Sequence, residues 1–400
     1  GCVGGGLYDC NGRIRNNLIS GNSSQQDGGG LYQCNGIIYD NDINGNAAGD
    51  DGGGICSCHG VIRNNIIHDN ASNEDGGGAA FSDAIILNNH ISGNQAKYGG
   101  GLSECDGNIT GNQILQNFAD TFGGGLHECQ GMINGNEIKG NSSQYHGGGL
   151  YRCLEMKNNI INENFALSWG GGIYLGRKGN LENCTVTSNT ATRGGGVFYN
   201  GEPPFTPTPT PTPTPWLLSP ENNENYSQKE STPLSEEKVV SADSIINRSQ
   251  KGRIFNSIEW NNNPPGIEIY NQNYLPIVNY SCIEKVWADG SGNIDEDPHF
   301  QKNYELPYLG EESPCIDAGN PSDEYYDGCR PPGKGALRSD MGAFGGPKNC
   351  VWLSEKVKNL ISILGRKQDD PDNNVLEDYN CDGRVDVADI VYYQLNFSSE

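Results

Sequence analysis

The sequence contains a set of oxygen-bearing side chains near its C-terminus whose spacing suits a calcium ion. Calcium prefers oxygen ligands at positions 1, 3, 5, 9 and 12 of a twelve-residue loop, with glycine at position 6 and a backbone carbonyl at position 7. The five side-chain ligands, the glycine and the carbonyl donor would be Asp378, Asn380, Asp382, Asp386, Asp389, Gly383 and Arg384. The sequence therefore predicts a Ca²⁺-binding loop, with residues 353–364 forming an adjoining helix; a solvated acidic turn is the alternative.

Charged residues also recur in the first half of the chain, at a fixed distance from a repeated Gly-Gly-Gly triplet. Glu104, Glu128 and Arg152 each lie five residues after the start of a triplet, and His127 lies beside them. On stacked strands they would be ~4.8 Å apart, close to the separation of the two carboxylates of a retaining glycosidase. A ladder imposes that spacing on any two acidic residues, so a solvated face with one ion pair between rungs is the other interpretation.

Rings occupy the position just before four of the triplets: Tyr98, Phe122, His146 and Trp169. We expect this column to be exposed at a turn, where it would bind a sugar or another protein. Packing of the rings against a flanking segment would equally explain the column.

The elements that position these residues follow from the repeat itself. Its period is 23 or 24 residues, and short β-branched segments alternate with glycine and asparagine turns, which is typical of strands stacked in parallel. The nine triplets start at Gly4, Gly28, Gly52, Gly76, Gly99, Gly123, Gly147, Gly170 and Gly194. The predicted fold is an all-β, right-handed parallel β-helix of about nine regular coils and degenerate C-terminal coils, followed by a small α-helical calcium-binding tail.

Equivalent positions of successive coils predict side-chain columns. One inward column begins Leu7, Leu31 and Ile55, and asparagines such as Asn41 and Asn65 should form hydrogen-bonded ladders at the turns. A further column contains Cys10, Cys34, Cys58, Cys105, Cys129 and Cys153. Stacked cysteines lie within reach of a disulfide, but each group of three leaves one unpaired, so we expect mainly buried free thiols.

Composition narrows the functional classes. There are 26 basic and 50 acidic residues, a net charge of −24, which disfavours nucleic acids and anionic membranes as partners. No apolar run approaches the ~18 residues of a membrane span. The Walker, Rossmann, GxSxG and HExxH motifs are missing from the sequence.

The chain divides into four parts by sequence character. Regular repeats fill residues 1–201, and a Thr-Pro-rich, polar stretch that is a candidate for glycosylation fills 202–250. Degenerate repeats follow in 251–347, so the Thr-Pro stretch is expected to be an insertion within one β-helix. The last part, 351–400, holds the predicted calcium loop.

Three resemblances to known families accompany these patterns. Residues 292–300, 313–319 and 340–344 resemble the choice-of-anchor Q region of bacterial surface β-helices, and the triplets with Ile-x-x-Asn segments resemble polymorphic outer-membrane-protein repeats. The calcium loop, with Asp389 at its last position, resembles a type I dockerin, although the second loop of a dockerin survives only as a trace near Asp370 to Asn374. These resemblances imply an extracellular or bacterial cell-surface location and a cohesin-like partner.

We therefore expect an extracellular structural or adhesive protein that binds carbohydrate or a surface protein. Its first residues lie directly inside a coil, so end-to-end self-association into filaments is a further expectation. The alternative is a polysaccharide lyase or glycoside hydrolase acting through Glu104, Glu128, Arg152 and His127.

Overall fold

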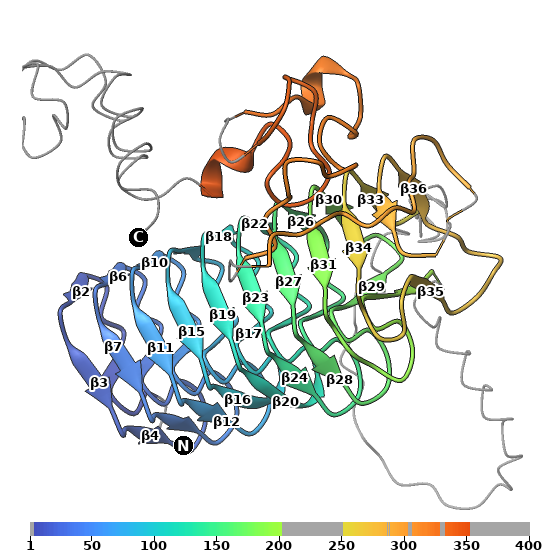
Figure 1. The fold of residues 1–400 in the computed structure, drawn as a ribbon. Coiled ribbons are helices and arrows are strands. Elements are labelled where there is room, and N and C mark those ends of the chain that lie inside the picture. Colours follow the sequence, from blue (N-terminus) through green and yellow to red (C-terminus); the bar gives the residue numbers. More distant parts are fainter. Residues whose placement is uncertain are drawn as a thin grey trace, which may run out of the picture.

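The computed structural model describes residues 4–201 and 251–352, apart from short gaps at 286, 288, 303–305 and 329–332. Over this part the chain winds into a parallel β-solenoid of right-handed type (Figure 1). The predicted fold class is confirmed, and the calcium-binding tail lies outside the described residues. No helix in the described part is long and apolar enough to cross a membrane.

Three ten-stranded sheets and one seven-stranded sheet run along the solenoid. The first sheet contains β1 (Leu7–Tyr8), β5 (Leu31–Tyr32), β9 (Ile55–Cys56), β13 (Ala79–Ala80), β17 (Leu102–Ser103), β21 (Leu126–His127), β25 (Leu150–Tyr151), β29 (Ile173–Gly176), β32 (Val197–Asn200) and β35 (Ile267–Ile269). The second contains β2 (Arg13–Arg15), β6 (Ile37–Tyr39), β10 (Val61–Arg63), β14 (Ile85–Leu87), β18 (Ile109–Thr110), β22 (Met132–Asn134), β26 (Glu155–Lys157), β30 (Asn180–Glu182), β33 (Arg253–Phe255) and β36 (Ile277–Asn279).

The third sheet contains β3 (Leu18–Ser20), β7 (Asp42–Asn44), β11 (Ile66–His68), β15 (His90–Ser92), β19 (Gln113–Leu115), β23 (Glu137–Lys139), β27 (Ile160–Asn162), β31 (Thr185–Thr187), β34 (Ile258–Trp260) and β37 (Cys282–Ile283). The fourth contains β4 (Ser23–Ser24), β8 (Ala47–Ala48), β12 (Ala71–Ser72), β16 (Gln95–Tyr98), β20 (Phe118–Phe122), β24 (Ser142–Ser143) and β28 (Phe165–Ala166). Two 3₁₀ turns, η2 (Asp323–Tyr325) and η3 (Asn349–Trp352), follow.

The core consists of apolar columns that run through the coils. In the second sheet Ile38, Ile62 and Ile86 are paired in register, and each is almost completely buried. Each coil is too thin to bury its apolar side chains alone, so it is stabilised by its neighbours above and below. This explains how a chain with only 34% hydrophobic residues forms an ordered interior.

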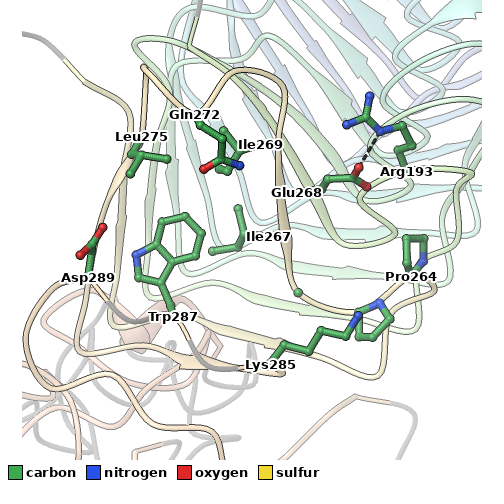
Figure 2. A pocket seen from close by; sticks show the side chains of 12 residues that line it. Arg193, Pro264, Ile267, Glu268, Ile269, Gln272, Leu275, Lys285, Trp287 and Asp289 are labelled. Atoms are coloured by element: carbon green, nitrogen blue, oxygen red, sulfur yellow. Dashed lines mark hydrogen bonds and ion pairs between the residues drawn. The ribbon is translucent and has the colours of Figure 1, made fainter.

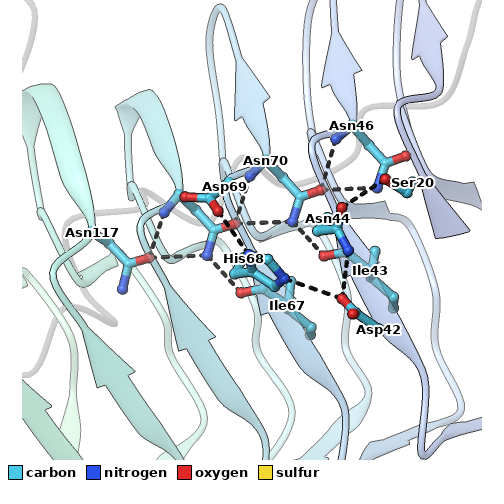
Figure 3. A network of polar contacts seen from close by, with 11 residues as sticks. Ser20, Asp42, Ile43, Asn44, Asn46, Ile67, His68, Asp69, Asn70 and Asn117 are labelled. Carbon is cyan, nitrogen blue, oxygen red and sulfur yellow. Dashed lines mark hydrogen bonds and ion pairs between the residues drawn. The ribbon is translucent and has the colours of Figure 1, made fainter. Parts of the chain in front are cut away.

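The asparagine ladders form as the sequence predicts. Asn70 Nδ2 donates to Asn94 Oδ1 at 3.0 Å and to the carbonyl oxygen of Ile43 at 2.9 Å, and Asn46 Nδ2 donates to Asn70 Oδ1 at 2.9 Å (Figure 3). All three asparagines are buried. The ladder thus satisfies backbone groups at turns that the strand hydrogen bonds do not reach.

The glycine triplets lie where the backbones of successive coils approach each other closely. Gly76, the first of its triplet, has φ +57°, and a Cβ on Gly78 would lie 2.6 Å from the carbonyl oxygen of Gly101 in the next coil. A larger residue at these positions would force the coils apart. The triplet is therefore a structural signature of the repeat.

The cysteine column is buried except at Cys10, which is partly exposed, and it contains no disulfide. Cys10, Cys34, Cys58, Cys105, Cys129 and Cys153 are all free thiols, as expected. Ser82 continues the column where cysteine is missing, and its Oγ accepts the backbone N–H of Cys58 at 3.1 Å. A small side chain that can accept a backbone hydrogen bond is evidently what this position requires.

The solenoid continues on both sides of residues 202–250. Strand β32 belongs to the first sheet, and β33 extends the second sheet by pairing with β30. Strands β33, β34 and β35 are therefore in register with the regular coils despite their degenerate sequence. Residues 202–250 themselves lie outside the described part.

The segment after the last coil turns back along the side of the solenoid (Figure 1). Asn158 Nδ2 donates to the carbonyl oxygen of Gly345 at 2.8 Å, and the indole N–H of Trp352 donates to the Asn158 carbonyl oxygen at 2.9 Å. The backbone N–H of Ala343 donates to Thr185 Oγ1 at 3.0 Å. Residues around 340–352 thus form a side cover over coils that precede them by more than 150 residues.

Two buried carboxylates hold this side cover together. Asp340 accepts the N–H of Asp317 at 2.9 Å and of Lys334 at 2.7 Å, while Asp327 accepts the N–H of Gly346 at 2.6 Å. Burial raises the pKa of Asp327 to about 7 and that of Asp340 to about 6. Asp340, within the motif that resembles the choice-of-anchor Q region, and Asp327, outside it, therefore act as acceptors for otherwise unpaired backbone amides.

Candidate functional site

The outer face of the first sheet changes character along the solenoid. Its outward column starts with Tyr8 and Tyr32, continues with three small residues, and returns to large rings. The full column reads Tyr8, Tyr32, Cys56, Ala80, Ser103, His127, Tyr151, Tyr174, Phe198 and Glu268. The three small residues, Cys56, Ala80 and Ser103, are all buried.

The column before the triplets changes at the same place. It consists of aspartates in the early coils, of rings in the later ones and of an arginine before the last triplet: Asp27, Asp51, Asp75, Tyr98, Phe122, His146, Trp169 and Arg193. Asp75 is the last aspartate and pairs with Tyr98 of the next coil. The acidic and aromatic halves of the face therefore meet at Asp75.

The rings form what we call the ring stack, defined as Tyr98, Phe122, His146 and Trp169 with Tyr151, Tyr174 and Phe198 beneath them. Phe122 and His146 are 5.2 Å apart and tilted by 9°, and His146 and Trp169 are 4.5 Å apart and tilted by 10°. Phe122 also stacks on Tyr151 at 4.5 Å.

The stack differs from the expected exposed column. All four outer rings are only partly exposed, so the expectation of an exposed column is wrong. Stacking occupies the ring faces along the row, since adjacent coils bring the rings to contact distance. The rings hence present mainly their edges to a ligand; binding by Tyr98, Phe122, His146 and Trp169 stays a prediction.

A cluster of four polar side chains, which we call the junction cluster, lies where the two halves meet: Asp75, Ser103, Glu104 and His127. Ser103 Oγ donates to Asp75 Oδ1 at 2.6 Å and lies 2.9 Å from His127 Nδ1. One ligand atom from each of Asp75, Glu104 and His127 lies within 4.8 Å of the others. His127 stacks between Tyr98 and Tyr151 at 5.2 and 5.5 Å, which fixes its ring plane.

The members of the junction cluster differ in their exposure to solvent. The His127 side chain is 9% exposed and that of Asp75 17%, whereas Glu104 is more open to solvent. Burial, with a smaller effect of the Arg152 charge, lowers the pKa of His127 to about 4. Burial also raises the pKa of Asp75 and of Glu104, and neighbouring carboxylates add to both shifts. The imidazole is thus neutral at pH 7 and retains a lone pair.

Glu128 and Arg152 lie beside the cluster on the next two coils. Their side chains form an ion pair with 3.5 Å between Glu128 Oε1 and Arg152 Nη1, and both are partly exposed. With Glu104 they occupy a column of left-handed residues, at φ values of 46–51°. The ion pair between rungs that the sequence allows is present.

The structure places all four predicted catalytic candidates on one face, and it adds two residues that sequence reasoning missed. Asp75 precedes His127 by two coils and belongs to a different column, so the repeat alone does not bring them together. Ser103 belongs to the small-residue interruption of the outward column. That interruption, followed by the change from aspartate to rings, is the signal in the sequence that could have located the cluster.

A separate cavity of about 580 Å³ lies at the last coil (Figure 2). Trp287, Ile267 and Leu275 pack together there against the end of the core, and Arg193 Nε bonds Glu268 at 2.5 Å on one rim. The indole N–H of Trp287 is buried and has no hydrogen-bond partner in the described part. The charged residues that line this cavity are Arg193, Glu268, Lys285 and Asp289.

The predicted calcium ligands Asp378, Asn380, Asp382, Arg384, Asp386 and Asp389 lie outside the described residues. No family model matches the chain, and no curated protein or solved structure matches it either. The class of protein is therefore the one that the fold defines: a parallel β-solenoid with a polar cluster and a ring stack on one face.

Proposed function

We propose that this chain is an extracellular structural or adhesive protein that binds carbohydrate or a surface protein along the outer face of its first sheet. The observation that carries the proposal is the alignment of two rows on that face. The edges of the ring stack form one row, and Glu104, Glu128 and Arg152 form the other, held at the spacing of the coils.

The chemistry of these rows suits an extended hydroxyl-rich ligand. Carboxylates and a guanidinium offer hydrogen bonds to hydroxyl groups, and ring edges offer apolar contact between them. Because the coils are locked by asparagine ladders, the rows lose little conformational entropy when a ligand binds. The Ca²⁺ loop at 378–389, a cohesin-like partner and end-to-end self-association belong to the same proposal.

Binding to immobilised polysaccharides tests the proposal. The double variant Glu128→Ala/Arg152→Ala removes two members of the charged row without leaving an unpaired charge, and it should reduce retention at least tenfold. A matched control is Lys139→Ala/Glu163→Ala, which removes a pair at 3.5 Å on the third sheet. Equal binding by both double variants and the parent chain would refute the assignment of this face.

Self-association is measured separately, by light scattering of the full chain in calcium. Growth of the scattering mass with concentration supports end-to-end assembly. A monomer at all concentrations refutes assembly and leaves the carbohydrate-binding face to be judged by its own experiment.

A polysaccharide lyase or glycoside hydrolase is the second candidate, favoured by one specific observation. Asp75 and Glu104 bring carboxylate oxygens within 4.8 Å of each other, beside a neutral imidazole. That is near the separation of ~5–5.5 Å used by retaining glycosidases. A reducing-sugar assay on pectins, alginates and xylans tests it, with Glu104→Gln as the variant that should abolish any turnover.

A further inference from the structure

We propose that the junction cluster binds a divalent transition-metal ion through Asp75, Glu104 and His127. The site goes beyond the proposed function, since it requires neither a glycan nor a reaction. It is also distinct in chemistry from the predicted calcium loop, which contains only oxygen ligands.

The donor atoms are already gathered. One carboxylate oxygen of Asp75, one of Glu104 and a ring nitrogen of His127 all lie within 4.8 Å of one another. Metal–ligand bonds of ~2.0–2.2 Å place atoms bound to one ion ~3–4 Å apart, so small side-chain rotations would complete the shell. Glu104 is the most exposed of the three and can make that adjustment at least cost.

His127 provides the observation that points to a ligand beyond an acidic cluster. Its ring is nine-tenths buried, and Ser103 is its only hydrogen-bond partner in the described part of the chain. Nδ1 lies 2.9 Å from Ser103 Oγ and 3.8 Å from Asp75 Oδ1, and Nε2 has no hydrogen bond within the described part. An imidazole nitrogen is a good ligand for a transition metal, and the rings of Tyr98 and Tyr151 hold the plane of the His127 ring fixed.

The local charge favours a cation at this point. Asp75 and Glu104 bring two carboxylates together at this point, while the nearby Arg152 is already engaged by Glu128. Lys97, the other close cation, is bonded to Glu74 at 2.7 Å. A divalent ion would neutralise the excess negative charge that these basic groups leave uncompensated.

Ser103 fits the arrangement as an orienting group. Its hydroxyl bonds both Asp75 and His127, so it holds the two ligands relative to each other, as groups next to metal ligands commonly do. The mixture of one nitrogen and two oxygen ligands suits Zn²⁺, Co²⁺ or Mn²⁺ better than Ca²⁺, which prefers oxygen alone.

Cobalt titration of the full chain tests the site, because Co²⁺ bound to nitrogen and oxygen ligands gives a visible absorption spectrum. Excess Ca²⁺ is kept present so that the predicted oxygen-ligand loop is saturated. We expect one equivalent of Co²⁺ to produce a band that Zn²⁺ displaces, and His127→Gln to abolish it.

The matched control is His68→Gln. His68 also has carboxylate neighbours, but its Nε2 is 3.1 Å from Asp42 and its Nδ1 is 2.8 Å from Asp69, so both nitrogens are engaged (Figure 3). The His68 variant should keep the cobalt band. A band that survives in His127→Gln, or that is lost only in His68→Gln, overturns the proposal, as does the absence of any band in the parent chain.

A second variant tests the site independently, in case the His127 variant does not fold. Glu104→Gln changes a more exposed side chain, and circular dichroism and melting temperature without metal should match those of the parent. We expect it to weaken Co²⁺ binding at least tenfold. Unchanged affinity in a folded Glu104 variant would exclude Glu104 as a ligand and refute the three-ligand site.

Discussion

Removal of one rung of the asparagine ladder should destabilise the solenoid strongly. Asn70 is fully buried, and its Oδ1 accepts the backbone N–H of Asn46 at 3.0 Å and the side-chain amide of Asn46 at 2.9 Å. Its own amide donates to Asn94 and to the carbonyl oxygen of Ile43. Asn70→Ala deletes all four hydrogen bonds at once.

The expected magnitude follows from which groups lose their partner. The backbone N–H of Asn46 becomes a buried donor without an acceptor, which costs ~1–3 kcal/mol, and the other bonds contribute ~0.5–1.5 kcal/mol each. We expect the free energy of unfolding to fall by about 3 kcal/mol. Urea titration followed by far-ultraviolet circular dichroism measures the change.

Asn44→Ala is the matched control. Asn44 lies two residues before Asn46 on the outer face of the third sheet and is half-buried, and its amide donates to the neighbouring Asp42 side chain at 2.6 Å. Its replacement should cost less than about 1 kcal/mol. Equal losses in the two variants would show that the ladder contributes no more than a surface hydrogen bond, and would refute the reasoning.

Three further predictions address the ring stack, the side cover and the calcium loop. Trp169→Ala removes a ring stacked on His146 and Phe198 and should lower the free energy of unfolding by about 2–4 kcal/mol. The control Tyr8→Ala, at a half-exposed ring, should lower it by less than about 1 kcal/mol. Equal melting temperatures of the two variants would contradict the packing role of Trp169. Burial raises the pKa of Asp327 to about 7, so the stability that the protonated carboxyl contributes is present below its ordinary pKa of about 4 and is lost as pH rises to about 7. Asp327→Asn should remove this decline in the free energy of unfolding. The same pH profile of unfolding in the variant and the parent would exclude this role of Asp327. Asp382→Ala should abolish calcium binding measured by titration calorimetry and leave the β-sheet circular dichroism intact; undiminished binding would show that the ligands lie elsewhere.

The repeat made the architecture predictable because every constraint recurs at one spacing. Each repeated feature requires a residue to lie next to the residue one repeat, about 24 positions, away. Parallel stacked coils satisfy this requirement for the triplets, the asparagine columns and the isoleucine columns at once. The side cover was not predictable in its position. Its contacts, such as that of Trp352 with Asn158, join residues 194 positions apart that share no repeat.

The candidate site was predictable only in part, for a geometric reason. Residues in one column are brought together by register, which placed Glu104, Glu128 and Arg152 in a row. Asp75 reaches the outward column across coils because Ala80 and Ser103 are small, and that depends on side-chain volume rather than on the period. The orientation of each ring likewise depends on contacts with neighbouring rings. The position of Trp169 before a triplet therefore does not predict that its side chain is half-buried.

Burial, rather than proximity, distinguishes the junction cluster from other charged groups on the solenoid. Residues of one column on adjacent coils are neighbours, so a pair such as Lys157 with Glu182 forms by register alone and is partly screened by solvent. His127 and Asp75 have lost most of their hydration, and burial shifts the pKa of both toward the neutral form. A pair of stacked rings would fit this face without that cost, as Tyr151 and Tyr174 do on the next two coils after His127. Buried titratable groups at the place where the acidic half of the face meets the ring stack are typical of a ligand-binding site.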